Sequence, residues 1–149
     1  MMIMSDPNET RPLNILLVED DDGDAKALKR AFEKARIANP IRRALDGIEA
    51  LDVLKGENGQ PKMPAPYILL VDLNMPRMNG IQLVESIRAD EELRQSIVFI
   101  LTTSKRDEDK EAVYNLNVTG YVVKATAGQD FLNLVSLMDC YWRIVEMPQ

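Results

Sequence analysis

The sequence contains no histidine and a single cysteine, Cys140, and both shortages exclude large classes of chemistry. Without histidine the chain cannot build a Ser-His-Asp triad or a metal site that uses imidazole. One cysteine cannot form a disulfide within the chain, so the expected location is a reducing compartment, the cytoplasm. Any acid, base or ligand chemistry must therefore come from carboxylates, lysines and hydroxyls.

The chain also lacks the apolar and basic runs of membrane proteins and nucleic-acid-binding proteins. No run reaches the roughly eighteen apolar residues of a membrane helix, so we expect no membrane span. The N-terminal segment has neither the basic start nor the apolar core of a signal peptide. The formal net charge is −6 with no block of lysine and arginine to offset it, which argues against nucleic acid as a partner.

The length of 149 residues suits one domain with one core. We expect residues 1–12 to be a flexible leader and residues 13–149 to form the domain. Short apolar runs typical of buried strands alternate with segments of helical periodicity. The expected strands are 13–18, 41–45, 67–73, 97–103 and 120–124, and the expected helices are 23–36, 48–55, 80–89, 107–115 and 129–145. This order predicts an α/β fold in which helices cover both faces of a doubly wound, five-stranded parallel sheet.

Polar side chains of chemical interest follow four of the expected strands. Glu19 and Asp20 follow the first, Asp72 ends the third, and Thr102 and Lys124 end the last two. Ligands of open parallel sheets collect at the carboxyl ends of the strands, so we expect these side chains to converge. Carboxylate oxygens without His or Cys suit Mg²⁺, and a lysine and a hydroxyl beside it would stabilise a phosphoryl group. Asp72, a single acid after the most apolar strand, is the best candidate nucleophile and would form an aspartyl phosphate.

Three more acids, Asp21, Asp22 and Asp24, come directly after the acidic pair. We expect them to cap the first helix and to interact favourably with its positive end.

Four motifs resemble those of bacterial two-component response regulator receiver domains, in that family's order and approximate spacing. They are LLVEDD, LLVDLNMPRMNG, FILTTS and GYVVK. The resemblance covers roughly residues 13–145 and implies the flavodoxin-like receiver fold, with strand order 2-1-3-4-5. It also implies a signalling phosphoacceptor, not an enzyme acting on a separate substrate, which a sensor histidine kinase phosphorylates.

The resemblance gives each matching residue a role. Asp72 is implied as the phosphoacceptor, Lys124 as the phosphate-binding cation, Thr102 as the switch hydroxyl and Tyr121 as an aromatic residue that reorients. Plain core packing is an equally good interpretation of Tyr121. The implied ligands of Mg²⁺ are Asp20, Asp72, Glu19 through water, and Asn74 through its backbone carbonyl.

The chain departs from the family pattern after the lysine. Ala125 follows Lys124, where the family usually has a proline, often after a cis peptide bond. A cis bond without proline costs roughly 2.5–4 kcal/mol. We therefore expect the Lys124–Ala125 bond to be trans.

A narrower resemblance is to the single-domain response regulators of bacteriophytochrome histidine kinases. The points of likeness are LTTS, the long loop before the third strand, and YW in the last helix followed by Pro148. This likeness implies a bacteriophytochrome kinase as the partner. We expect no output module after the receiver, so the expected output is another protein, a phosphorelay or a change in self-association.

Two other functional classes remain to be tested. LLVEDDDG also resembles the Asp-x-Asp strand end of haloacid dehalogenase-type phosphohydrolases, with Asp20 and Asp22 as its acids. A final acidic pair after the lysine and a cap segment are missing. A flavodoxin-like FMN binder would need phosphate donors in the first loop, where this chain has acids.

The expected last helix has more apolar residues than packing against the sheet alone requires. One stripe would pack on the sheet, and Leu137, Cys140 and Ile144 lie on a second stripe. Burying such side chains is worth roughly 1.5–3 kcal/mol each, which favours a C2 homodimer through this helix. The alternative is that scattered exposed apolar residues have no partner.

Overall fold

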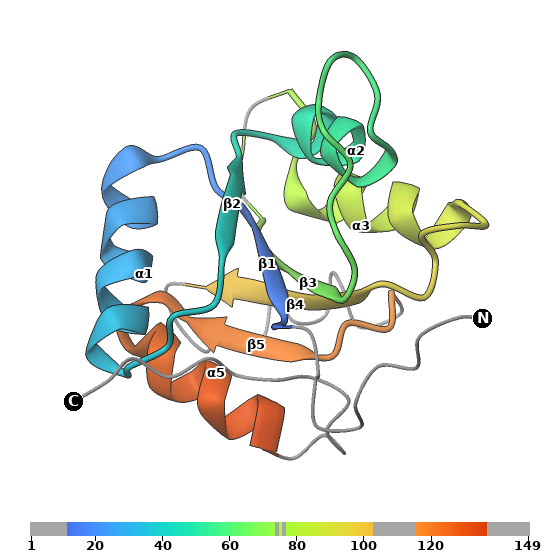
Figure 1. Cartoon of the computed structure of the whole chain (residues 1–149). Coiled ribbons are helices and arrows are strands. Elements are labelled where there is room, and N and C mark those ends of the chain that lie inside the picture. The colour runs from blue at the N-terminus through green and yellow to red at the C-terminus, as the bar shows by residue number, and fades with distance from the viewer. Residues whose placement is uncertain (1–11, 74, 76, 103–115, 137–149) are drawn as a thin grey trace, which may run out of the picture.

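The computed structural model describes residues 12–73, 75, 77–102 and 116–136. Five strands form one parallel sheet in the order β2-β1-β3-β4-β5 (Figure 1), which confirms the expected topology. The strands are β1 (Asn14–Val18), β2 (Ile41–Ala44), β3 (Tyr67–Asp72), β4 (Ile97–Thr102) and β5 (Gly120–Val123). The helices are α1 (Asp22–Lys34), α2 (Gly47–Lys55), α3 (Gly80–Ala89), α5 (Ala127–Ser136) and the short 3₁₀ helix η1 (Lys124–Thr126).

Several expectations fall on residues outside those ranges. They are the helix over 107–115, most of the leader over 1–12, the ligand Asn74, and the interface residues Leu137, Cys140 and Ile144. The homodimer through the last helix therefore stays a prediction.

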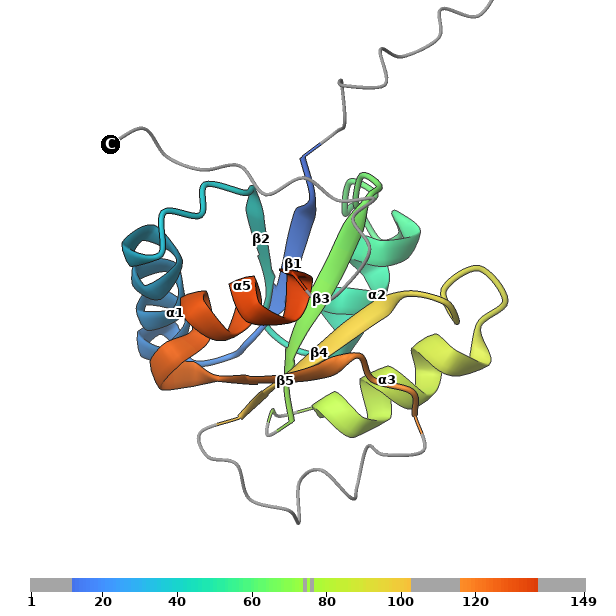
Figure 2. The ribbon, with the colours of Figure 1, turned by 90° about the horizontal axis from the view of Figure 1, so that it is seen from below.

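The helices form two layers on opposite faces of the sheet. Figure 2 shows α1 and α5 on one side and α2 and α3 on the other. Successive strand residues alternate between the two resulting cores, as the pleat requires. In β1, Leu16 and Val18 pack on the α2–α3 side, while Ile15 and Leu17 pack on the α1–α5 side. Because both faces are covered, the strands are apolar throughout, which is the pattern that predicted a parallel sheet.

Aromatic rings join α1 and α5 to the sheet. The centroid of the Phe131 ring in α5 lies 5.1 Å from that of Phe32 in α1 and 6.1 Å from that of Phe99 in β4. Gly128 allows the start of α5 to approach α1, because a Cβ there would lie 2.4 Å from the carbonyl oxygen of Ala31. This packing fixes the direction in which the chain leaves β5, and with it the position of Lys124.

The segment after β5 differs from the expected one. Lys124 was expected to end the fifth strand and is instead the first residue of η1, and α5 begins at Ala127, two residues before the expected start. The Lys124–Ala125 peptide is trans, as expected; the cis bond in the described residues is Ala65–Pro66. A short 3₁₀ turn thus takes the place of the proline-containing segment of the family pattern.

Within the described residues, no helix combines the length and apolar character needed to cross a membrane.

Arg88, near the end of α3, donates hydrogen bonds to backbone carbonyl oxygens in two separate segments of the chain. Its guanidinium donates hydrogen bonds to the carbonyl oxygens of Arg94 and Ser96, each 2.7 Å away, in the connection to β4. It also donates to the carbonyl oxygens of Leu116 at 2.7 Å and Asn117 at 3.0 Å, just before β5. Burial lowers the pKa of this guanidinium. The side chain therefore links α3 to the segment that enters the last strand.

We expect Arg88→Ala to lower the free energy of unfolding by about 2–4 kcal/mol, because several carbonyls lose a charged donor at once. Arg94→Ala is the matched control, since its side chain is exposed and its backbone carbonyl is retained. It should change stability by less than about 0.5 kcal/mol. Urea unfolding followed by circular dichroism measures both, and equal effects of the two substitutions would contradict this role of Arg88.

Candidate functional site

The expected acids meet at the carboxyl edge of the sheet. Glu19 follows β1 directly, and Asp72 ends β3, its neighbour in the sheet. Asp20 completes a group of three carboxylates whose oxygen atoms lie within 4.8 Å of one another. Glu19 and Asp72 are 1% and 7% exposed, whereas the side chain of Asp20 is exposed. The predicted convergence of these three acids is therefore observed.

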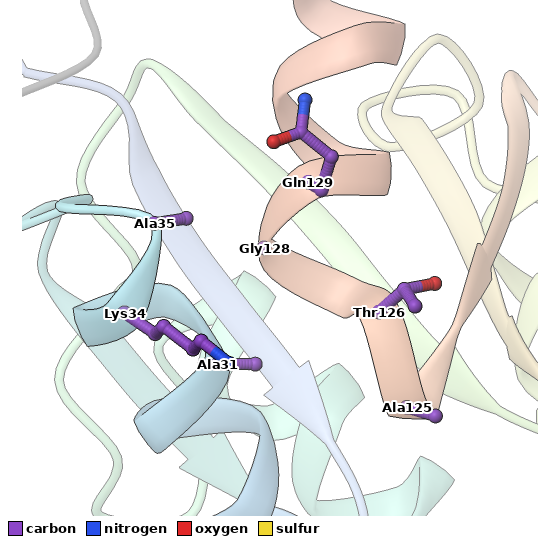
Figure 3. Close-up of a pocket in the computed structure, with 7 residues that line it drawn as sticks. All are labelled: Ala31, Lys34, Ala35, Ala125, Thr126, Gly128 and Gln129. Atoms are coloured by element: carbon purple, nitrogen blue, oxygen red, sulfur yellow. The ribbon is translucent and has the colours of Figure 1, made fainter.

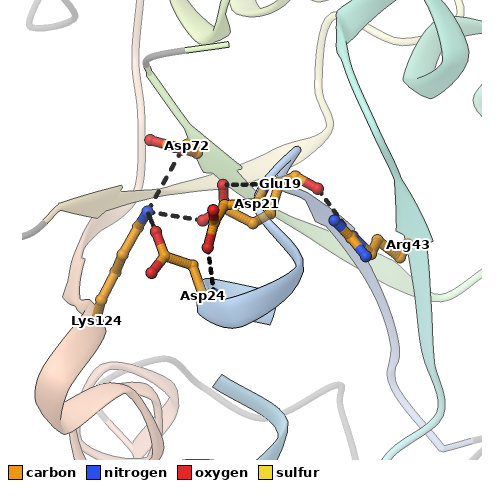
Figure 4. Close-up of polar contacts among 6 residues, drawn as sticks. All are labelled: Glu19, Asp21, Asp24, Arg43, Asp72 and Lys124. Carbon is orange, nitrogen blue, oxygen red and sulfur yellow. Dashed lines mark hydrogen bonds and ion pairs between the residues drawn. The ribbon is translucent and has the colours of Figure 1, made fainter. Parts of the chain in front are cut away.

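Lys124, the residue directly after β5, contacts these acids. Its Nζ lies 2.7 Å from Glu19 Oε1, 2.8 Å from Asp24 Oδ2 and 3.4 Å from Asp72 Oδ2 (Figure 4). Burial alone would lower the pKa of this ammonium, but the hydrogen bonds to Asp24 and Glu19 and the charge of Asp72 outweigh it. The net effect raises the pKa of Lys124 above its ordinary value, which favours the charged ammonium.

The Glu19 carboxylate is in an unfavourable place for a negative charge. Burial, followed by its hydrogen bond with Asp72, raises the pKa of Glu19 to about 7, although Lys124 acts in the opposite direction. One ammonium therefore does not fully offset the acids at this edge. A further positive charge bound here would favour the ionised form of Glu19.

The donor set fits a hard divalent cation. Magnesium prefers oxygen ligands and uses one or two carboxylates together with water and phosphate oxygens. Glu19, Asp20 and Asp72 supply such oxygens close together, and one of these acids faces solvent. This arrangement would let an ion bind while it keeps several of its waters.

Arg43 of β2 holds the loop that carries the acidic pair. Its Nε donates to the backbone carbonyl of Glu19 at 2.8 Å, and its Nη1 contacts Asp22 Oδ1 at 2.7 Å. The pKa of Asp22 is lowered by this hydrogen bond. The β1–α1 loop is thus fastened to the neighbouring strand on the side away from Lys124.

The acids that follow the pair have more varied roles than predicted. Asp21 is the N-cap of α1 and accepts a hydrogen bond from the backbone N–H of Asp24 at 2.7 Å, which confirms its capping role. Asp22 and Asp24 lie in the first turn, as expected for charges near the positive end of a helix. However, Arg43 binds the carboxylate of Asp22, and Lys124 binds that of Asp24. Sequence reasoning missed Asp24 as a site residue because its partner is 100 residues away.

The two residues with expected switch roles lie on the last two strands. Thr102 ends β4 and is 6% exposed. Tyr121 pairs with Ile100 across β4 and β5 and packs against the core on the α2–α3 side. Burial raises the pKa of the Tyr121 hydroxyl. The structure thus places Tyr121 partly in the core, and a movement of either residue stays a prediction.

The loop after Asp72 is held at its α3 end and through Arg77. At the α3 end, Gly80 donates its N–H to Leu73, and a Cβ at Gly80 would lie 2.4 Å from the carbonyl oxygen of Asp72. Only glycine therefore lets α3 begin directly against the end of β3. In the middle of the loop, Arg77 adopts φ 60° and forms an ion pair with Asp46, the N-cap of α2. The loop that follows the candidate nucleophile is thus attached to the β2–α2 turn.

A separate pocket of about 300 Å³ lies between α1 and the start of α5 (Figure 3). The residues that line it are Ala31, Lys34, Ala35, Ala125, Thr126, Gly128 and Gln129. Ala125 and Thr126 follow Lys124 directly, so this pocket adjoins the candidate site without sharing its acids.

Comparisons with known proteins show which family this chain resembles. The family model of the response regulator receiver domain matches residues 15–136. The chain is 34% identical over 131 residues to the probable methanogenesis regulatory protein FilR2 of Methanothrix harundinacea, covering 88% of this chain and 84% of that protein. It is 30% identical over 139 residues to the response regulator Rcp1 of Synechocystis, covering 93% and 94% of the two chains.

Solved structures give the same result. The bacteriophytochrome response regulator RtBRR matches with a TM-score of 0.77 and 30% identity, over 93% of this chain and 85% of that chain. The Mn(2+)-bound form of Rcp1 matches with a TM-score of 0.64 and 27% identity, over 93% of this chain and all of that chain (100%).

The ion pair between Asp46 and Arg77 gives stability a pH dependence. The hydrogen bond that Arg77 donates to Asp46 lowers the pKa of Asp46 below its ordinary value of 3.8. A carboxyl group whose pKa is lowered on folding stabilises the native state at pH values above its ordinary pKa. This stabilisation is lost as the pH falls through the pKa of the folded state. Asp46→Asn keeps a capping oxygen but removes the charge, so it should lower stability by about 1 kcal/mol at pH 7.

The difference between Asp46→Asn and the unchanged protein should disappear in acid, which urea unfolding at a series of pH values measures. Arg77→Gln should produce the same pH dependence as Asp46→Asn, because it removes the other partner. A constant difference between the unchanged protein and Asp46→Asn down to pH values well below 3.8 would contradict this account.

Proposed function

Because this chain belongs to the response regulator receiver domain family, we propose that it accepts a phosphoryl group on Asp72 from a sensor histidine kinase and signals through the resulting surface change. The observation that carries this proposal is the placement of the Lys124 ammonium 3.4 Å from the buried Asp72 carboxylate, beside two further acids. The match to this family supports the receiver interpretation of the acidic loop over a phosphohydrolase or an FMN binder.

The chemistry assigned to Asp72 is a single displacement. A carboxylate oxygen of Asp72 attacks the phosphorus of a phosphohistidine, and the bond from phosphorus to the imidazole nitrogen breaks. Lys124, which stays protonated, would bind an oxygen of the transferred group and balance its charge. The hydroxyl of Thr102, at the end of the next strand, would donate to another of these oxygens.

We propose Mg²⁺ as the cation at Glu19, Asp20 and Asp72, with the backbone carbonyl of Asn74 as a further ligand. When bound, it would supply charge neutralisation for the phosphoryl oxygens. The all-oxygen donor set supports this choice, and the structure of Rcp1 in a Mn(2+)-bound form supports divalent binding in a relative.

We propose a bacteriophytochrome kinase as the partner. The support is the similarity, over nearly the whole chain, to RtBRR, which is a bacteriophytochrome response regulator. Rates of phosphotransfer from a panel of purified histidine kinases would identify the partner, and faster transfer from a kinase of another class would overturn this choice.

We also propose self-association through the last helix, by the second apolar stripe of Leu137, Cys140 and Ile144. Leu137→Glu combined with Ile144→Glu should give a folded monomer in sedimentation analysis, because a charge in each apolar contact opposes burial. Sedimentation of the unchanged protein as a monomer at micromolar concentration, with or without phosphorylation, would contradict the dimer.

The phosphoacceptor assignment has a direct test with acetyl phosphate and a histidine kinase as donors. Labelling should require Mg²⁺, and Asp72→Asn should abolish it because the attacking oxygen is lost. Asp20→Asn should weaken Mg²⁺ binding at least tenfold, because one carboxylate of the donor set is removed.

The position of the label separates the assignments. Acid-stable and base-labile phosphate that persists on Asp72→Asn would show that another residue accepts the phosphoryl group. Label on Asp20 would instead support a phosphohydrolase of the haloacid dehalogenase type.

A further inference from the structure

Asp24 makes a contact with Lys124 that neither the family motif nor its place at the positive end of α1 predicts. It lies in the first turn of α1, and its carboxylate contacts the Lys124 ammonium at 2.8 Å. The N-cap bond from its own N–H to Asp21 fixes its backbone, and Figure 4 shows its side chain directed at Lys124. The contact therefore joins the first helical turn to the first residue after the last strand.

Asp24 acts on the site through Lys124, not as a member of the carboxylate group. The acids close enough to hold one ion, among the described residues, are Glu19, Asp20 and Asp72. Asp24 is outside that group. Its side chain alone is 45% exposed, compared with 1% and 11% for the side chains of Glu19 and Asp72. It is thus the solvent-side partner of a largely buried ammonium.

The three contacts of Lys124 are unequal. An ammonium has three N–H donors, and here an acid lies near Nζ in each of three directions. The contacts with Glu19 and Asp24 are 2.7 and 2.8 Å, the length of charge-assisted hydrogen bonds, whereas the contact with Asp72 is 3.4 Å. The ammonium is thus held nearest the two acids that do not accept the phosphoryl group.

We propose that Asp24 is a positioning residue that competes with the phosphoryl group for Lys124. This inference rests on the proposed function, because it concerns a group attached to Asp72. When that group arrives, Lys124 must exchange the Asp24 contact for a phosphoryl oxygen, so Asp24 stabilises the unmodified state. Removal of its charge shifts the balance toward the modified state.

Beryllofluoride, which occupies the phosphoryl position without covalent transfer, is the probe. At saturating Mg²⁺, Asp24→Asn should tighten its binding by about three- to tenfold, the range expected for one partly exposed charged contact. Asp22→Asn is the matched control. It removes a negative charge two residues before Asp24, from a carboxylate that binds Arg43. Fluorine NMR titration measures both, and Asp22→Asn should change the affinity by less than about twofold.

A second readout does not depend on the phosphoryl analogue. Nitrogen NMR of the lysine side chains follows the Lys124 ammonium, whose signal is identified by its loss in Lys124→Arg. Asp24→Asn should shift this signal in the absence of beryllofluoride and Asp22→Asn should leave it in place. Asp24→Glu, which keeps the charge, should restore beryllofluoride affinity to within about twofold of the unchanged protein.

The outcomes separate this inference from the proposed function. Failure of the unchanged protein to bind beryllofluoride, or equal binding by Asp72→Asn, would overturn the phosphoacceptor assignment and the inference with it. Binding that is lost in Asp72→Asn but equal in Asp24→Asn and Asp22→Asn would overturn the role of Asp24 and leave the phosphoacceptor in place.

Discussion

Repulsion between carboxylates at one edge of the sheet is the constraint on which the arrangement of this protein depends. Two buried acids, Glu19 and Asp72, lie side by side, and burial already disfavours the charge of Glu19. The ammonium of Lys124 balances part of this charge, and it reaches the acids only because β5 lies next to β4 and η1 turns back toward α1. The packing of Phe131 and Gly128 against α1 also positions Lys124, since it fixes the chain just after this lysine.

The loops around the acids are held by contacts from outside the site. Arg43 binds the loop after β1, and the pair of Asp46 and Arg77 binds the loop after β3. Both attachments start from β2 or from the turn that follows it, at the edge of the sheet. The edge strand contributes no acid of its own to the group of Glu19, Asp20 and Asp72, yet it helps to determine where two of the acidic segments lie.

The sequence alone predicted the topology of the sheet and the convergence of the acids, because both follow from local patterns. Apolar runs bounded by charge identified the five strands, and parallel strands bring their carboxyl ends together, so Glu19, Asp20 and Asp72 could be placed beside one another. The contacts of Asp24, Asp46 and Arg88 could not be predicted this way. The partners of Asp24 and Asp46, and two of the carbonyls bound by Arg88, are 28 or more residues away along the chain. An acid or arginine at a helix end has the same local pattern whether or not a distant group binds it. The start of α5 was also missed, since it depends on how closely Gly128 can approach α1.

The distance along the chain between Asp24 and Lys124, 100 residues, has a consequence for synthesis. A ribosome produces the acidic loop well before the lysine, so a nascent chain that stops before β5 carries the repelling acids without their cation. Under the proposed function, such a chain carries Asp72 but lacks the ammonium that would hold a phosphoryl oxygen. The acids at the carboxyl edge of the sheet therefore gain this cation only when β5 and η1 have formed.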